Sequence, residues 1–340
     1  MTVTPRDRVL AAIQGEVIDR PPMTLWRHWP IDDQDAEVHA TVAVEHHGGL
    51  GLDLLKLTPS AAYMSEAWGA RTEYRGDVMG VRDYVSRPIG SAADWDHIVP
   101  LDVAQSPSLQ REVDVVRLVR DHVGPAVPVL PTVFTPLSVV RYLAGDGFFL
   151  PHLRMHRADV ERALDAITET TIGLVRALLA AGADGIYFSL LPASHTMVSM
   201  QEYREVALPR DQQVFAAAED SVLRVAHFHL PFPLLPLSRH LPANVVSWEH
   251  AGSGPSLAEG MEVTGKAVMG GVDQLGLLAH GRAADVAAEV RRVAAIAREP
   301  RSHGVIVATS CSYPLTAPRG NLLAFSRSVR GLGEDVGHSM

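Results

Sequence analysis

The feature that most constrains the fold of this chain is a repeating order of short apolar runs, polar or glycine-containing loops and longer alanine- and leucine-rich stretches. The short runs are rich in β-branched residues, and the longer stretches place apolar residues at helical spacing, so strands and helices are expected to alternate. Such alternation predicts a parallel sheet covered by helices. Eight strands are predicted: Pro22–Trp26, Leu52–Leu57, Val127–Val133, Gly185–Ser189, Val222–Phe228, Asn244–Trp248, Ala267–Gly271 and Gly304–Ala308.

Eight strands in this order favour a closed (β/α)₈ barrel, the TIM barrel, which needs about 250 residues and often carries insertions. An open doubly wound sheet is the alternative, but no GxGxxG motif follows the first predicted strand. The predicted helices are Asp33–Glu45, Leu109–His122, His156–Ala181, Met200–Glu219, Leu257–Thr264 and Ala283–Arg298.

The 340 residues contain no linker-like stretch of Gly, Ser or Pro, so we expect one domain over residues 1–340. Residues 61–100 do not follow the strand–helix order. Their sequence AWGARTEYRGDVMGVRDYVSRPIG alternates polar and apolar residues around glycines, which is typical of a β-hairpin. We expect a small hairpin inserted after the second strand, forming a rim or lid.

Composition argues against several classes of partner. The net charge is −9 and no basic run is present, so nucleic acid is not expected as the main partner. No apolar stretch approaches the roughly 20 residues that span a bilayer, and the N-terminal sequence lacks the apolar run of a signal peptide. A single cysteine excludes an intramolecular disulfide. We therefore expect a cytoplasmic protein that acts on a small molecule, without a membrane partner.

In (β/α)₈ barrels the active site lies at the C-terminal ends of the strands, and three such positions here carry metal-binding residues. His227 and His229 are two apart at the end of the fifth predicted strand, so their side chains point to the same side. Cys311, the only cysteine, follows the eighth strand. Two imidazoles and a thiolate suit zinc, or another divalent transition metal, with a fourth position open. The alternative is a pair of hydrogen-bonded core histidines and a small buried thiol.

Trp26, Arg27 and His28 crowd the end of the first predicted strand. Arg27 is a candidate to bind a substrate carboxylate in a bidentate pair, with Trp26 as a wall of the pocket. His28 is a candidate general base. The alternative is an aromatic plug at the barrel rim with an ion-paired arginine.

Three further strand ends carry charged candidates. Glu249 follows the sixth strand and is expected to orient a ligand imidazole or act as a general base. Asp273 follows two glycines that allow close approach to a ligand, and Lys56, one of two lysines, ends the second strand. We interpret Asp273 and Lys56 as substrate-binding residues. For Glu249 and Asp273, a helix-capping role is the alternative.

Several segments, taken in order, resemble the uroporphyrinogen decarboxylase superfamily. The opening RDRVLAAIQGEVIDRPP is similar to the N-terminal helix of that family and its DRPP entry to the first strand. The later matching segments are LDLLKLTPSAAY, PTVFTPLSVVRYLAG, AGADGIYFS, VMGGVDQ, RAADVAAEVRR and PLTAPRGNLLAF. The resemblance covers nearly the whole chain and implies a (β/α)₈ barrel.

One branch of this superfamily decarboxylates uroporphyrinogen without a cofactor. Its members carry two arginines in a loop of the R-Q-A-G-R-Y type, whereas the loop here reads WRHWP and keeps only Arg27. The family's N-L-G-H-G stretch is replaced by ATSCSYP. The resemblance therefore implies that most of the tetrapyrrole-binding residues are missing.

The other branch consists of zinc-dependent methyltransferases that move a methyl group between a corrinoid and a thiol. Their zinc ligands resemble His-x-Cys after the fifth strand and Cys in P-G-C-G after the eighth. His227 and Cys311 match two of these positions, and His229 stands where the middle cysteine would be. The resemblance implies a zinc ion, a corrinoid on a partner protein and a homodimer. Replacing one thiolate by an imidazole raises the net charge of the site by one.

The leading hypothesis is a zinc-dependent transferase that activates a small thiol or similar nucleophile for methyl transfer. One alternative is a decarboxylase (lyase) for a porphyrinogen or another carboxylate, anchored at Arg27. A second is a non-catalytic barrel that binds a small ligand or a metal.

Overall fold

The computed structural model describes residues 3–299 and 303–334. Every pair of neighbouring strands in its main sheet is parallel. The strand order is β1 (Leu55–Leu57), β4 (Val129–Phe134), β5 (Gly185–Ser189), β6 (Leu223–Phe228), β7 (Val245–Trp248), β8 (Ala267–Val272) and β9 (Val305–Thr309). Because the neighbours follow the chain order, this is the parallel α/β arrangement expected of a TIM barrel.

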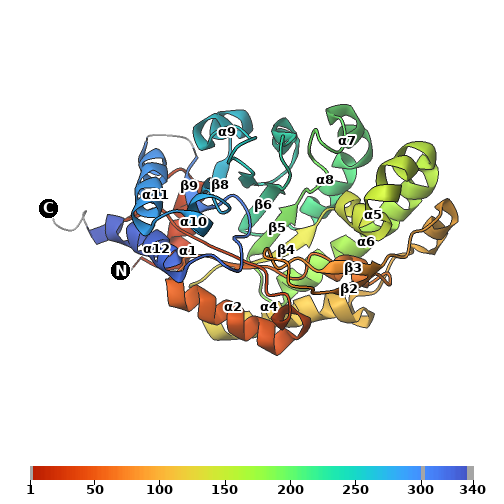
Figure 1. Cartoon of the computed structure of the whole chain (residues 1–340), viewed down its shortest axis with the longest axis horizontal. Coiled ribbons are helices and arrows are strands. Elements are labelled where there is room, and N and C mark those ends of the chain that lie inside the picture. The colour runs from red at the N-terminus through yellow and green to blue at the C-terminus, as the bar shows by residue number, and fades with distance from the viewer. Residues whose placement is uncertain (1–2, 300–302, 335–340) are drawn as a thin grey trace.

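Residues 22–26 lie between the two edges of this sheet and close it. The amide of Thr24 donates to the carbonyl of Val307 at 3.0 Å, and the amide of Asp53 donates to the carbonyl of Met23 at 2.9 Å. The expected first strand is thus present as an extended segment, but within residues 3–299 and 303–334 it forms a single β-bridge, between Met23 and Val307. Pro21 and Pro22 have no amide hydrogen to donate, which limits a regular ladder here. In Figure 1 the red N-terminal helix α1 (Pro5–Ile13) accordingly lies beside the blue strand β9.

Helices surround the strands (Figure 1). Besides α1 they are α2 (Ala36–Leu50), α4 (Pro107–Val123), α5 (Pro136–Met155), α6 (Arg157–Ala180), α7 (Met200–Val206), α8 (Leu208–Ala216), α9 (Leu257–Thr264), α10 (Leu277–His280), α11 (Ala283–Arg298) and α12 (Arg319–Glu334). The predicted ranges of α9 and α11 agree with the structure. Within the described residues, no helix is long and apolar enough to cross a membrane.

Two helical predictions differ from the structure. The stretch predicted as one helix, Met200–Glu219, is two helices that meet at Ala207, because Pro209 lies in the first turn of α8, where a missing amide hydrogen costs least. Helix α5 was not among the helices predicted from periodicity. It contains Pro151 and a kink at Gly145, where φ is 69°, and both interrupt the helical spacing of its apolar residues.

The predicted hairpin is confirmed. Strands β2 (Arg71–Glu73) and β3 (Asp83–Ser86) pair antiparallel after the short helix α3 (Tyr63–Glu66). The connection between them packs on the barrel: the amide of Leu315 donates to the carbonyl of Val78 at 2.8 Å, and Arg82 Nη1 donates to the carbonyl of Pro30 at 2.5 Å. The insertion is therefore attached to the loops that follow the first and last barrel segments.

Two apolar cores follow from the alternation of side chains along the strands. The smaller core fills the barrel and includes Trp26, Leu130, Tyr187 and Met269. The larger core lies between the strands and the helices. Polar side chains near the carboxyl ends of the strands lie just beyond the smaller core, where the candidate site is found.

Candidate metal centre

His227, His229 and Cys311 form a compact cluster at the carboxyl ends of the strands. The distance from His227 Nε2 to His229 Nδ1 is 3.4 Å, and that from Cys311 Sγ to His229 Nδ1 is 3.3 Å. One donor atom from each residue lies within 4.8 Å of the other two. Zinc bonds of about 2.0–2.3 Å at tetrahedral angles place neighbouring ligand atoms about 3.4–3.8 Å apart. The three donors therefore need only small movements to share one cation.

Strand register explains why the imidazole of His227 faces inward. His227 is the Cα partner of Ser189 on β5 and of Ser247 on β7, so these three residues form one layer inside the barrel. The side chain of His227 is 1% exposed and lies against the ring of Tyr187, with 5.0 Å between ring centroids. Its Nδ1 lies 3.1 Å from Ser247 Oγ. The other ring nitrogen is left to face the cluster.

The three residues alter one another's pKa values. Burial alone raises the pKa of the Cys311 thiol, but the charge of His229 and hydrogen bonds from His227 and His229 outweigh it, so the pKa lies well below its ordinary value. For His229, burial lowers the pKa, but the charge of Cys311, the hydrogen bond with Cys311 and the charge of Glu249 together outweigh burial, so the net shift is upward. Burial lowers the pKa of His227. Cys311 is thus held in the thiolate form, which is the form that binds metals.

A cavity of about 300 Å³ opens beside the cluster and is lined by all three of its residues. Of the other predicted site residues, Trp26, His28 and Lys56 also line it. Burial lowers the pKa of His28 to about 4, so its imidazole is neutral at pH 7. Burial likewise lowers the pKa of Lys56 to about 7.

The other three predicted residues, Arg27, Glu249 and Asp273, do not line this cavity. The guanidinium of Arg27 lies 4.3 Å from the centre of the Trp29 ring, beside a smaller pocket. Glu249 Oε2 accepts a hydrogen bond from Gln274 at 3.0 Å, and burial raises the pKa of Glu249.

The carboxylate of Asp273 accepts hydrogen bonds from the amides of Leu275, Gly276 and Leu277, as a residue capping the turn before α10 does. This arrangement agrees with the capping alternative for Asp273. The predicted roles of Arg27, Glu249 and Asp273 in substrate binding or catalysis stay predictions.

Several cavity residues were not predicted. They come from the hairpin and from the start of α5: Met79, Val81, Arg82, Tyr84, Arg141 and Tyr142. A signal for Arg141 exists, because the sequence TPLSVVRYL follows the third predicted strand with a proline typical of the first helical turn. The hairpin residues had no such signal, since their position depends on how the insertion folds back over the barrel.

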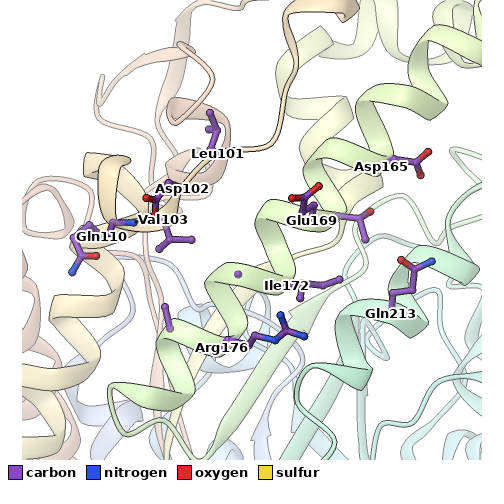
Figure 2. Close-up of a pocket in the computed structure, with 13 residues that line it drawn as sticks. Leu101, Asp102, Val103, Gln110, Asp165, Glu169, Ile172, Arg176 and Gln213 are labelled. Atoms are coloured by element: carbon purple, nitrogen blue, oxygen red, sulfur yellow. Dashed lines mark hydrogen bonds between the residues drawn. The ribbon is translucent and has the colours of Figure 1, made fainter.

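A larger hollow, of about 880 Å³, lies on the outer surface between α4, α6 and α8 (Figure 2). Asp102, Asp165, Glu169 and Arg176 are among its lining residues. It includes no strand residue and neither histidine nor cysteine. Its position on the helical layer separates it from the metal-binding cluster.

Comparisons with known proteins agree with this architecture. The family model described as "Uroporphyrinogen decarboxylase (URO-D)" matches residues 4–332. Over 236 residues the chain is 26% identical to the methylcobamide:CoM methyltransferase MtaA of Methanosarcina barkeri, which covers 64% of this chain and 68% of that protein. Over 229 residues it is 31% identical to the uroporphyrinogen decarboxylase of Nocardia farcinica, covering 64% of this chain and 61% of that protein.

Among solved structures, a methyltransferase from Methanosarcina mazei superposes with a TM-score of 0.80 at 22% identity, over 97% of this chain and 99% of that one. At this identity the likeness establishes the fold. The family match spans nearly the whole chain, and the curated relatives are enzymes of two kinds, methyltransferases and decarboxylases. The chain therefore belongs to the uroporphyrinogen decarboxylase (URO-D) family of enzymes.

Proposed function

We propose that this protein is a zinc-dependent methyltransferase whose methyl acceptor is a small thiol. The observation that carries the proposal is the cluster of His227, His229 and Cys311, whose donor atoms lie within 4.8 Å of one another beside a cavity. The relatives named methylcobamide:CoM methyltransferases support methyl transfer as the reaction class.

The donor set fits zinc. Two imidazoles and one thiolate are borderline and soft ligands of the kind that zinc prefers, and three protein ligands leave a fourth position for a substrate. When bound, zinc would supply Lewis acidity that lowers the pKa of a small thiol. Ser247 would hold the His227 ring in the orientation that directs Nε2 to the cluster.

The remaining residues of the site have separate tasks. The rings of Trp26 and Tyr187 wall the cavity and limit the entry of water. His28 is neutral at pH 7, so it can accept the proton that the thiol loses. Glu249 does not touch the cavity, but its negative charge raises the pKa of the His229 imidazole. We therefore assign a catalytic role to His28 and a positioning role to Glu249.

We infer that the methyl donor is a methylated corrinoid carried by a partner protein, as the names of the relatives suggest. The acceptor sulfur forms a bond to the methyl carbon as the bond between that carbon and the donor breaks. The electron pair of the broken bond leaves with the donor, and the thiol proton passes to His28 and then to solvent.

Decarboxylation is the second candidate, because other relatives are named uroporphyrinogen decarboxylase. It would need an anchor for the substrate carboxylates, and Arg27 lies outside the cavity that contains the cluster. The anchor predicted for a decarboxylase is therefore not beside the cluster, and the basic residues that are beside it, Lys56, Arg82 and Arg141, leave this second candidate to be decided by the assay below.

Elemental analysis of the purified protein, followed by an assay with methylcobalamin and small thiols, tests the proposal. We expect about one zinc per chain, and loss of both zinc and methyl transfer in Cys311→Ala and His229→Ala. His240→Ala, an exposed histidine outside the cluster, is the control that keeps both. Full methyl transfer by the metal-free protein would refute the zinc assignment. Zinc-loaded protein that decarboxylates a porphyrinogen and transfers no methyl group would favour the second candidate. Zinc-loaded protein with neither activity would indicate a binding protein.

A further inference from the structure

The cavity beside the cluster has an unbalanced charge. Among the described residues that line it, three carry basic side chains, Lys56, Arg82 and Arg141, whereas none is an aspartate or glutamate and the one anionic group is the Cys311 thiolate. The guanidinium of Arg82 donates hydrogen bonds to Thr72 and to the carbonyl of Pro30. Arg141 pairs with the exposed Asp146 at 2.8 Å, and its buried Nε has no hydrogen-bond partner among the described residues. Basic side chains therefore outnumber acidic ones in the lining of the cavity.

Lys56 is the least compensated of these cations. Lys56 is 9% exposed, and its Nζ donates a hydrogen bond to Thr58 Oγ1 at 3.1 Å. Its other close neighbours are the rings of Tyr187 and Trp26, whose centres lie 4.5 Å and 5.1 Å from Nζ. An ammonium group can donate three hydrogen bonds, and among the described residues the structure gives Lys56 one acceptor, Thr58, besides the two ring faces.

The second lysine of the chain, Lys266, has an ammonium group whose hydrogen bonds are accepted by the protein itself. Lys266 Nζ donates to the carbonyls of Leu241 at 2.8 Å and Ala243 at 2.6 Å, away from the cavity. Both lysines are partly or largely buried, but of the two only Lys266 donates to backbone carbonyls in the part of the chain that the structure describes. An anion in the cavity would give Lys56 the hydrogen-bond acceptors that backbone carbonyls give Lys266.

The walls of the cavity indicate the shape and polarity of the rest of the ligand. Five aromatic rings line the cavity: Trp26, Tyr84, Phe134, Tyr142 and Tyr187. They form two groups, because Trp26 contacts Tyr187 edge-on at 5.6 Å, while Phe134 and Tyr84 contact Tyr142 at 5.4 Å and 6.3 Å. Flat walls of this kind pack well against a flat apolar body.

We propose that the small thiol which accepts the methyl group in this cavity also carries an aromatic ring and a carboxylate, and that Lys56 binds its carboxylate group. The proposal names the substrate class of the same site and so rests on the proposed function. A quaternary ammonium or sulfonium ligand would also favour aromatic walls. Three cations and no carboxylate in the lining disfavour such a ligand, and the Lys56 ammonium already occupies the faces of Trp26 and Tyr187.

Binding of four probes, measured by calorimetry, tests the proposal without any methyl transfer. The probes are benzoate, neutral benzamide, cationic benzyltrimethylammonium and acetate, which lacks the ring. A carboxylate could also bind zinc directly, so the titrations use chelator-treated protein and, separately, the Cys311→Ala variant. We expect benzoate to bind at least about tenfold more tightly than benzamide and the cationic probe, since a charge-assisted hydrogen bond in a buried site contributes at least that factor. Benzoate should also bind more tightly than acetate, because acetate has no ring to pack against the aromatic walls.

Substitutions at the two lysines test whether Lys56 causes the preference for benzoate. Lys56→Met should abolish the preference for benzoate over benzamide and leave benzamide binding within about twofold, because it removes the charge and keeps the volume. Lys266→Met is the matched control and should keep the preference. Thermal melting shows whether each variant is folded, and Lys56→Arg, which keeps the charge, should retain part of the preference.

Equal binding of benzoate and benzamide to the wild type, tighter binding of the cationic probe, or a preference that persists in Lys56→Met would each overturn the proposal. So would the absence of binding by all four probes. None of these results touches the zinc content or the transfer of methyl groups to thiols. Failure of this inference is therefore distinguishable from failure of the proposed function.

Discussion

Ser247 Oγ lies 3.1 Å from Nδ1 of His227, and both residues are buried on neighbouring strands at the same level of the barrel. Nε2 of the same ring is 3.4 Å from Nδ1 of His229. Because one ring nitrogen faces the serine hydroxyl, the other is the one available to a metal. The hydroxyl therefore sets the orientation of the imidazole from behind, without touching the cavity.

Ser247→Ala should weaken zinc binding by about 10–100-fold, the usual effect of removing a group that orients a ligating imidazole. The variant leaves all three ligands in place, so the loss would come from a ring that is free to rotate or change tautomer. Zinc affinity is measured by competition with a chromophoric chelator. Ser326→Ala, another buried serine, on α12, is the control. Unchanged affinity in Ser247→Ala would show that packing against Tyr187 alone holds the ring.

Lys56→Met should raise the stability of the metal-free, ligand-free protein by about 1–4 kcal/mol, because it replaces a poorly compensated buried charge with an apolar side chain of similar length. The free energy of unfolding is measured by urea titration. Lys266→Met should instead be neutral or destabilising, because it leaves two carbonyl oxygens without the donor they have in the wild type.

The same variant should change how stability depends on pH. The folded pKa of Lys56 is about 7, below its ordinary value of 10.5, so between these pH values the unfolded chain holds a proton that the folded chain has lost. Stability of the wild type therefore rises with pH across this window. The advantage of Lys56→Met should be largest at pH 7 or below and smaller at pH 9. An advantage that is constant from pH 6 to pH 9 would contradict this explanation.

Gly80→Ala should loosen the hairpin from the barrel. Gly80 has φ of 79°, and a Cβ there would lie 2.7 Å from Cβ of His28. Gly76 has a similar φ of 90°, but a Cβ there would meet nothing within 4 Å. Both alanine variants carry backbone strain of order 1 kcal/mol, whereas only Gly80→Ala adds a steric clash.

Unfolding free energies and limited proteolysis of residues 74–82 separate the two effects. We expect Gly80→Ala to be less stable than Gly76→Ala by about 1–2 kcal/mol and to be cleaved faster between β2 and β3. Equal behaviour of the two variants would mean that the contact with His28 does not hold the hairpin in place.

Asp211→Asn should make stability less dependent on pH. Asp211 is fully buried, Tyr203 donates a hydrogen bond to its Oδ2 at 2.7 Å, and burial raises the pKa of the carboxyl to about 8. Between about pH 4 and pH 8 the folded state keeps a proton that the unfolded state has released, so wild-type stability falls as pH rises, at up to about 1.4 kcal/mol per unit.

Urea unfolding at pH 4.5, 6 and 7.5 checks this prediction. The asparagine can still accept the hydrogen bond from Tyr203, and the variant should gain on the wild type as pH rises. Asp121→Asn, at an exposed position of α4, should run parallel to the wild type. Parallel profiles for Asp211→Asn and the wild type would show that the carboxyl is ionised in the folded protein.

Much of the fold and the centre of the site could be predicted because their signals are local. Spacing of two along a strand puts His227 and His229 on one side, and helical spacing located α9 and α11 to the residue. Where local signals conflict, the predictions were less accurate. Helix α5 contains both a glycine kink and a proline, and the proline-rich segment at residues 21–22 makes one bridge where a strand was expected.

The sequence by itself determined the alternation of strands and helices, the hairpin insertion and which residue types are able to hold a metal, since each of these depends on neighbours within a few positions. Only the tertiary structure decided that Lys56 faces the cavity while Arg27 faces another pocket, and that Ser247 stands behind His227. The physical reason is that these relations depend on the register between strands far apart in the chain. Barrel closure sets that register through hydrogen bonds and packing, which no local pattern records.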